Sequence, residues 1–127
     1  LLSKGRGKTM GDGWETRRRR EPGNDWIIIK LAKKAIVKSI EIDTAHFKGN
    51  YPDSASISAA FFDDTIKYDS VIKNTKVWKV LLPQTKLKAD NIHKFKNLTN
   101  KDGVNYIKLE IYPDGGVSRL RVFGRLK

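Results

Sequence analysis

Hydrophobic and polar residues alternate along much of the chain with the period of two that is typical of β-strands. The segments with this alternation, or with a short β-branched run, are residues 25–31, 37–44, 54–62, 76–82, 91–95, 105–112 and 118–124. The apolar positions that we expect to face a core are Ile40, Ile42, Ile57, Ala59, Phe61, Ile107, Leu109, Ile111, Leu120 and Val122. Arg119 and Arg121 fall on the opposite face of the last segment. No segment shows the periodicity of a helix of useful length.

Turn signals separate these segments at short intervals. We expect residues 32–35 to turn between the first two strands and Pro83 to end the strand over residues 76–82. Residues 63–76 are polar and weakly patterned, which predicts a long connection with a short strand at Val71–Ile72. Seven or eight short strands of this kind predict an all-β fold, an antiparallel β-sandwich, whose loops gather at its two ends.

The length of 127 residues fits one domain, and a hydrophobic fraction of 39% suffices for one core. We assign residues 1–9 to a basic linker and residues 10–127 to the domain. The first residue is Leu rather than Met, so we expect a fragment, a processed chain or a trimmed one.

The net charge of +12 favours anionic partners, from a small carboxylate to nucleic acid or an acidic membrane surface. The lysines are dispersed, however, and no RNA-binding motif with exposed aromatic residues is present, so we expect no nucleic-acid partner. The sequence has no apolar run of the roughly 18 residues that a membrane span needs, no signal-peptide pattern at its start, and no cysteine for disulfide or thiolate chemistry. We expect a cytoplasmic protein without a membrane partner.

Three stretches combine glycines with charged and aromatic residues, namely residues 10–26, 43–53 and 112–121. They are too glycine-rich for helix interiors and too charged for buried strands. Such a composition in loops suits a polar ligand better than it suits packing. If all three lie at one end of the sandwich, they form one site.

The same stretches resemble the allantoicase family. The motifs are GDGWETRRRR at residues 11–20, GNDW at residues 23–26, DTAHFKGNYP at residues 43–52 and YPDGGVSRLR at residues 112–121. The resemblance runs from about residue 4 to residue 125. It implies a galactose-binding-like jelly roll, and an enzyme that hydrolyses allantoate to ureidoglycolate and urea in purine breakdown.

The family resemblance also implies partners. Allantoicases carry two similar domains in tandem and form oligomers, and this chain resembles one domain, more like the second. We therefore expect a homo-oligomer or a second allantoicase-like domain as partner. Asn24 stands where the family often has His, and residues 32–35 replace a glycine-bearing turn. If catalysis needs both domains, this chain alone is inactive.

Allantoate has one carboxylate and two ureido groups, so its site needs a cation, acceptors for N–H groups, and a general acid and base. Arginine suits the carboxylate because its planar fork binds it with two hydrogen bonds. Arg17, Arg18 and Arg119 are the candidates. The alternative is that the run over residues 17–20 is a solvated basic surface.

Glu15 is the first candidate for proton transfer, because no turn role explains it. Asp12 and Asp114 are candidate substrate acceptors, although a carboxylate beside glycine is more often a turn residue. Asp43 ends a strand and is a further candidate, which can also cap the next loop by hydrogen bonding. His46 is the second candidate for proton transfer because its pKa lies near neutrality, and an equally good interpretation is a histidine that stabilises its loop.

Lys48 and Asn50 could offer a cation and N–H groups to an anion, whereas a tight turn is the simpler account. No ligand spacing indicates a metal, so we expect no metal site and no cofactor. The main alternative to an enzyme is a non-catalytic module, or a half-domain, that binds a small anion or sugar, because this fold serves many functions.

Overall fold

Strands form nearly all of the regular structure in the computed structural model, which describes residues 1–3, 5–99 and 102–127. The strands are β1 (Trp14–Glu15), β2 (Asp25–Asp43), β3 (Ser54–Ala60), β4 (Lys79–Lys86), β5 (Ile92–Phe95), β6 (Gly103–Tyr112), β7 (Gly116–Val117) and β8 (Arg119–Leu126). A 3₁₀ turn, η1 (Met10–Asp12), precedes β1, and a short helix, α1 (Tyr68–Lys73), lies between β3 and β4. All the strand pairs are antiparallel.

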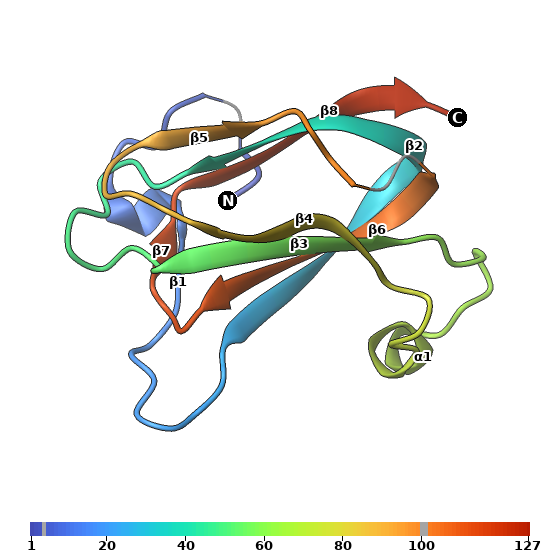
Figure 1. Ribbon diagram of the computed structural model, residues 1–127, viewed down its shortest axis with the longest axis horizontal. Helices are drawn as coiled ribbons and strands as arrows, with labels where there is room; N and C mark the ends of the chain where they lie inside the picture. The colour runs from blue at the N-terminus through green and yellow to red at the C-terminus, as the bar shows by residue number, and fades with distance from the viewer. Residues whose placement is uncertain (4, 100–101) are drawn as a thin grey trace.

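The long strand β2 belongs to both layers of the sandwich (Figure 1). Its first part, Asp25–Lys30, pairs with β6, which continues through β3 to β4. Its last part, Ile40–Asp43, lies between β5 and β8. The two layers are therefore β4-β3-β6-β2 and β5-β2-β8, and the predicted all-β antiparallel sandwich is confirmed.

The predicted turn at residues 32–35 is wrong, because β2 continues through this segment. The pairing register with β6 shifts between Lys30 and Ala35, so the strand bends there without ending. Ala32–Ala35 contains no Gly, Pro, Asn or Asp, the residues whose local conformations make tight turns. An irregular pairing of this kind lets one strand cross from one layer to the other.

The core lies between the two layers and contains nearly all of the predicted apolar positions. Ile40 and Ile42 of β2 meet Leu109 and Ile111 of β6, and all four are fully buried. Phe61 is the exception. It follows the end of β3 and is 45% exposed, with the Lys34 ammonium group 4.2 Å from its ring centroid.

The predicted strand at Val71–Ile72 is wrong, because both residues lie in α1. Val71 is buried in a second apolar cluster with Phe62 and Tyr106. The Trp78 indole packs on this cluster and donates a hydrogen bond to the Val71 carbonyl at 3.1 Å. Tertiary packing therefore determines this six-residue helix, which is too short to be stable from its own sequence.

The sequence predicted that Pro83 ends the strand, and this prediction is wrong. Pro83 lies within β4. β4 is an edge strand that pairs only with β3 among the described residues. The register shifts between the pairs Ala55–Thr85 and Ile57–Leu82, so Pro83 lies at an irregularity. An edge strand tolerates proline there because its missing N–H faces no partner.

Asn105 of β6 fixes the chain as it leaves β3. Its buried side chain accepts a hydrogen bond from the Phe62 N–H at 2.9 Å and donates one to the Phe62 carbonyl at 2.8 Å. We expect Asn105→Ala to lower the free energy of unfolding by about 1–3 kcal/mol, because both backbone groups would lose their partner in a buried site. Urea denaturation measures this change. The exposed Asn97→Ala control should stay within about 0.5 kcal/mol of wild type, and equal stability of the two variants would contradict this role.

Candidate functional site

The three glycine-rich loops meet at one end of the sandwich, beside β1 and β7 (Figure 1). The Gly116 N–H donates to the Asn50 carbonyl at 2.8 Å, which joins the third loop to the second. The Thr16 N–H donates to the Gly115 carbonyl at 3.0 Å, which joins the first loop to the third. The structure therefore brings together stretches that lie about 100 residues apart in the sequence.

Glycines allow these loops to approach so closely. A Cβ at Gly13 would lie 2.8 Å from both the Ser118 Cα and the Val117 carbonyl oxygen. Gly115 has a φ of +130°, and a Cβ there would lie 2.7 Å from the Asn50 carbonyl oxygen. Side chains at either position would separate the loops.

Glu15 lies at the exposed surface of this loop cluster. The Asn50 side-chain amide donates a short hydrogen bond to its carboxylate and also lies 3.6 Å from the Met10 sulfur. Asn50 itself is anchored through its carbonyl to Gly116. The first and second loops together therefore fix the direction of the Glu15 carboxylate while leaving it accessible.

The strand pattern placed Arg119 on the face opposite the core, but in the structure the residue is buried. Its side chain is only 2% exposed, and a salt bridge of 2.7 Å joins it to the Asp12 carboxylate. It also donates to the backbone carbonyls of Gly5, Asp12 and Ser118. A contact of Arg119 with a substrate carboxylate stays a prediction, and this arrangement does not favour it, because the chain itself already engages the guanidinium group.

Asp12 is the exposed partner of Arg119, and its carboxylate also accepts the Lys8 N–H at 3.2 Å. The hydrogen bond from the Arg119 guanidinium is the main reason that the pKa of Asp12 lies below its usual value. Asp12 therefore holds the turn η1 against β8. A direct contact of Asp12 with a substrate stays a prediction.

The described part of the segment interpreted as a linker, residues 1–3 and 5–9, contributes to this site. The Leu1 carbonyl accepts the Leu120 N–H at 3.0 Å, and the Gly5 carbonyl accepts hydrogen bonds from Arg119 and Arg121. Gly7 is buried, and a Cβ there would lie 2.5 Å from the Ser118 hydroxyl. The boundary between a linker and a domain at residue 10 stays a prediction.

Asp43 caps the second loop as predicted. Its carboxylate accepts the Ala45 N–H at 2.9 Å and a hydrogen bond of 3.1 Å from Arg121, and its carbonyl accepts the Ser118 N–H at 2.7 Å. The side chain is fully buried. These contacts indicate a structural role, because a buried carboxylate needs such partners and offers a substrate little surface.

His46 has a left-handed backbone with a φ of +74°. Its N–H donates to the Asp90 carboxylate at 2.8 Å, which is the main cause of a lowered Asp90 pKa. Its ring Nε2 is hydrogen-bonded to the Gly7 carbonyl. Nε2 must carry a proton for this bond, so Nδ1 is the basic nitrogen of the neutral ring. The ring is half-buried and fastens the N-terminal segment to the second loop.

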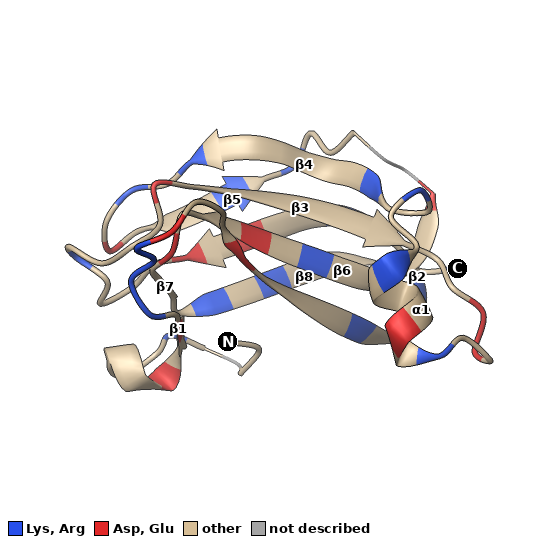
Figure 2. Cartoon of the chain, turned by 90° about the horizontal axis from the view of Figure 1, so that it is seen from below, with Lys and Arg blue, Asp and Glu red and all other residues tan. Residues whose placement is uncertain are grey.

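The arginine run follows β1 and forms the loop that Figure 2 shows in blue. Arg17 and Arg18 are exposed, as is Arg20, and they line an open hollow of about 880 Å³. Arg19 differs because the protein itself holds it in place. Its guanidinium donates a hydrogen bond of 2.8 Å to the Asp25 carboxylate, and its backbone N–H donates one of 2.6 Å to the Asp114 carboxylate.

Two of the predicted substrate-binding residues, Lys48 and Asp114, lie at the rim of the loop cluster but differ in exposure. Lys48 is exposed on the second loop and is free to meet an anion. Asp114 is half-buried and fixes the arginine loop through Arg19, so it is a positioning residue in this arrangement.

The sequence analysis missed four residues that build the site: Gly7, Arg19, Asp90 and Arg121. Arg121 shares the strand face of Arg119, and that alternation was the available signal for its role. Asp90 lies outside the three motifs, and nothing local indicates its contact with His46.

The described residues contain neither a cluster of metal ligands nor a helix that could span a membrane. No group of three or more His, Cys, Asp or Glu side chains there is arranged to hold a metal ion. Within residues 1–3, 5–99 and 102–127, no helix is long and apolar enough to cross a membrane.

The two glycines of the motif at residues 10–14 provide a matched test of loop docking. We expect Gly13→Ala to lower the free energy of unfolding by about 1–3 kcal/mol, because its Cβ would press on the backbone of β7 and its neighbour Ser118. A Cβ at Gly11 would meet nothing closer than 3.7 Å, so Gly11→Ala should be nearly neutral. Urea denaturation of both variants measures the difference, and an equal loss of stability would disprove close docking at Gly13.

The docking of residues 5–13 should also weaken in acid. The pKa values of Asp12 and Asp90 are lowered in the folded protein, by the Arg119 guanidinium and the His46 N–H respectively. Both carboxylates therefore favour the docked arrangement above about pH 4, and this contribution is lost as the pH falls through the lowered values. Amide hydrogen exchange of residues 5–13, corrected for intrinsic rates, should accelerate as the pH falls from 6 to 3. Asp12→Asn should reduce the pH dependence of exchange in residues 5–13. Unchanged protection of the wild-type residues at pH 3 would refute the proposed role of the two carboxylates.

Comparisons with known proteins place these observations in a family. The sequence profile described as "Allantoicase: Allantoicase repeat" matches residues 1–127. A "Probable allantoicase" of Rhizobium meliloti is 53% identical over 130 residues, which cover 99% of this chain and 38% of that protein. "Probable allantoicase 1" of Burkholderia mallei is 53% identical over 127 residues, which cover 99% of this chain and 37% of that protein. The chain thus spans well under half the length of these curated relatives.

Solved structures agree with the sequence comparisons. The crystal structure of allantoicase from Saccharomyces cerevisiae matches 94% of this chain and 34% of that one, with a TM-score of 0.79 and 36% identity. The C-terminal domain of a chitobiase from Bacteroides fragilis has a TM-score of 0.61 at 19% identity, covers 84% of this chain and 67% of that one, and shows a shared fold alone. The expected galactose-binding-like β-sandwich is confirmed. The chain belongs to the allantoicase family and comprises one allantoicase repeat.

Proposed function

We propose that this chain is one repeat of an enzyme that hydrolyses allantoate to ureidoglycolate and urea in purine degradation. Two findings support the proposal, namely membership of the family and the geometry of the loop cluster. The observation that carries it is the Glu15 carboxylate, which Asn50 orients at the exposed junction of the loops. A solvent-accessible, oriented carboxylate is suited to proton transfer with a bound substrate.

The proposed reaction breaks the bond between the central carbon of allantoate and one ureido nitrogen. A proton from the Glu15 carboxylic acid goes to that nitrogen, and urea leaves with the bonding electron pair. The remaining ureido nitrogen stabilises the developing cation at the central carbon. Water then adds to this carbon and returns a proton to Glu15, which restores the acid.

His46 is the second proposed proton carrier. Its Nε2–H is committed to the Gly7 carbonyl, so any exchange with substrate or water passes through Nδ1. The left-handed backbone at His46 is of the kind that surrounding contacts impose and that often occurs at functional sites. Glu15 remains the stronger candidate because its side chain is exposed at the loop junction.

The substrate carboxylate is assigned to exposed cations of the same end of the sandwich. Arg17 and Arg18 offer planar forks, and Lys48 offers a point charge from the second loop. Arg119 is the weakest of the predicted cations for this role, because its guanidinium is buried and bound by the chain. The excess of positive charge would also attract anionic allantoate to this end.

The full enzyme is proposed to contain more than this repeat. Its relatives are more than twice as long, so a second allantoicase-like domain, or a homo-oligomer, is the proposed partner. The exposure of Glu15, Asn50 and Lys48 is consistent with a second wall that excludes water during the reaction. Whether the chain is the first or second repeat, and its cytoplasmic location, stay predictions.

A second candidate is a half-domain that binds a small anion without catalysing its hydrolysis. The same exposure favours it, because an open surface binds a ligand more readily than it excludes water. The two candidates differ in whether urea is produced, so one assay separates them.

The deciding experiment measures urea release from allantoate by the full-length protein that contains this chain. We expect Glu15→Gln to lower kcat by about 10²–10⁴-fold, because the amide keeps the hydrogen bond to Asn50 but cannot exchange the proton. Glu21→Gln removes the same charge from an exposed position of the adjacent loop and should change kcat by less than about twofold.

The outcomes separate the proposals. Full activity of Glu15→Gln would remove Glu15 from proton transfer. Activity of residues 1–127 alone would place a complete site within this chain or its homo-oligomer. Allantoate binding without urea release by the folded full-length protein would favour the binding role.

A further inference from the structure

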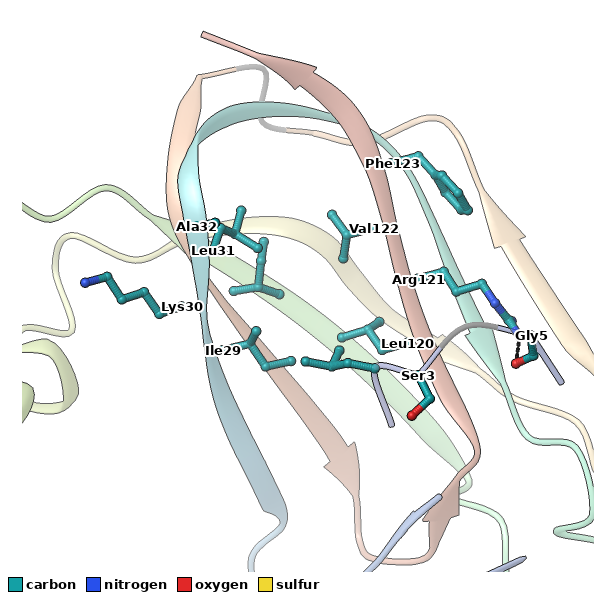
Figure 3. Close-up of a pocket in the computed structure, with 12 residues that line it drawn as sticks. Ser3, Gly5, Ile29, Lys30, Leu31, Ala32, Leu120, Arg121, Val122 and Phe123 are labelled. Carbon is teal, nitrogen blue, oxygen red and sulfur yellow. Dashed lines mark hydrogen bonds between the residues drawn. The ribbon is translucent and has the colours of Figure 1, made fainter. Parts of the chain in front are cut away.

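An apolar groove opens between the two sheet layers on the side away from β4 (Figure 3). It has a volume of about 490 Å³. Ile29 and Leu31 of β2 form one wall, and Leu120 and Val122 of β8 form the other. Figure 3 shows these side chains directed toward one another across the space, so the groove exposes the interior of the sandwich.

A second hollow of about 370 Å³ continues the groove toward the end of β8. The two hollows share Leu31, Ala32 and Val122, so they adjoin. At the far end of the second hollow β2 and β8 pair with each other, from Ala35–Leu126 to Val37–Gly124, so the space between the two strands closes there. The first hollow, where β2 and β8 are apart, runs along both strands and is apolar, which suits an extended chain.

The strands on both sides of the groove have open edges. Over Asp25–Lys30, β2 pairs with β6 alone in the described part of the chain. β8 pairs with β2, and among the described residues its other edge has one strand-like contact, from the Leu120 N–H to the Leu1 carbonyl at 3.0 Å. Alternate residues of a strand point their N–H groups the same way, so the Val122 N–H also faces the groove. Proteins normally cover such edges, because unpaired strands invite association.

We propose that an extended segment of the longer polypeptide, outside residues 1–127, lies in this groove as an additional β-strand between β2 and β8. Curated relatives match 99% of this chain over only 37–38% of their own length, so they contain abundant further polypeptide. Leu1 already lies beside β8, and Leu2 and Ser3 line the groove. A strand of about five or six residues, roughly 17–20 Å long, is of the usual size for such an edge.

The charges at the rim specify the chemistry of this strand. Lys33 and Arg125 line the second hollow, whereas Figure 3 shows the Lys30 and Arg121 side chains directed away from the first. The segment therefore alternates apolar side chains, which fill the groove, with polar side chains that include acidic ones at the rim. A second copy of this chain is a poor occupant, because each copy carries a net charge of +12.

Cysteine labelling tests the occupancy of the groove. The chain has no cysteine, so Val122→Cys gives a single probe within it, and mass spectrometry of the labelled peptide distinguishes it from cysteines elsewhere. The comparison uses residues 1–127 only once cooperative urea unfolding has shown that they fold alone. We expect maleimide to label this probe at least about tenfold more slowly in the full-length protein than in the folded residues 1–127, since a covered site reacts only after local opening. Val80→Cys on the distant edge strand β4, where Val80 is 54% exposed, should react alike in both.

Amide hydrogen exchange tests whether the occupant is a strand. In the full-length protein, residues 26–31 of β2 and 120–123 of β8 should exchange more slowly than in residues 1–127, because strand addition pairs their free N–H groups. Slower labelling together with slower exchange supports the proposal. Equal labelling of Val122→Cys in both proteins would overturn it, and so would protection of the cysteine without protection of the amides. If labelling of Val122→Cys in residues 1–127 slows as the protein concentration rises, the occupant of the groove is a second copy of the chain instead.

Discussion

The contacts of the buried Arg119 guanidinium hold the functional end of the molecule together. A charge removed from water must be paired and hydrogen-bonded, or its burial is strongly unfavourable. Asp12 supplies the opposite charge, and the carbonyls of Gly5, Asp12 and Ser118 supply further acceptors. To satisfy this one side chain, the N-terminal segment must lie across β8. That placement in turn brings β1 to β7 and directs Glu15 toward Asn50.

The close approach of the three loops is possible because small residues stand where the backbones meet. At Gly13 and Gly115 the neighbouring backbone lies so close that a Cβ would collide with it. Gly116 lies against the Phe47 ring, where a Cβ would overlap the ring atoms. The glycine-rich composition of the motifs is therefore a packing requirement as well as a source of flexibility. Charged residues in the same loops divide into two groups. Asp12, Asp43, Asp114 and Arg119 position the backbone, whereas Glu15, Arg17, Arg18 and Lys48 remain exposed to a ligand.

The apolar interior of the sandwich is covered on one side and exposed on the other. The described layers bury a continuous core between β3, β6 and the second half of β2, yet the first half of β2 and the far edge of β8 leave an apolar groove. The unpaired strand edges and the length of the relatives point to the same explanation, namely that the repeat is completed by polypeptide beyond this chain. The groove adjoins the site, because Gly5 and Arg121 line the groove and also take part in the contacts that hold the N-terminal segment at the site.

The alternation of apolar residues determined the strands β3, β6 and β8, because a period of two places one face of a strand in the core whatever its neighbours are. The motifs likewise determined the family and located the loops. Only the tertiary structure decided the continuation of β2 through Ala32–Ala35, the helix at Val71, and the burial of Arg119. Each of these depends on contacts between residues far apart in the chain: β2 bends to join two layers, Val71 packs on Phe62 and Tyr106, and Arg119 is covered by residues 5–12. Local sequence cannot show whether a polar side chain meets water or another part of the chain, which is why it identified the charged loops but not which charges are free.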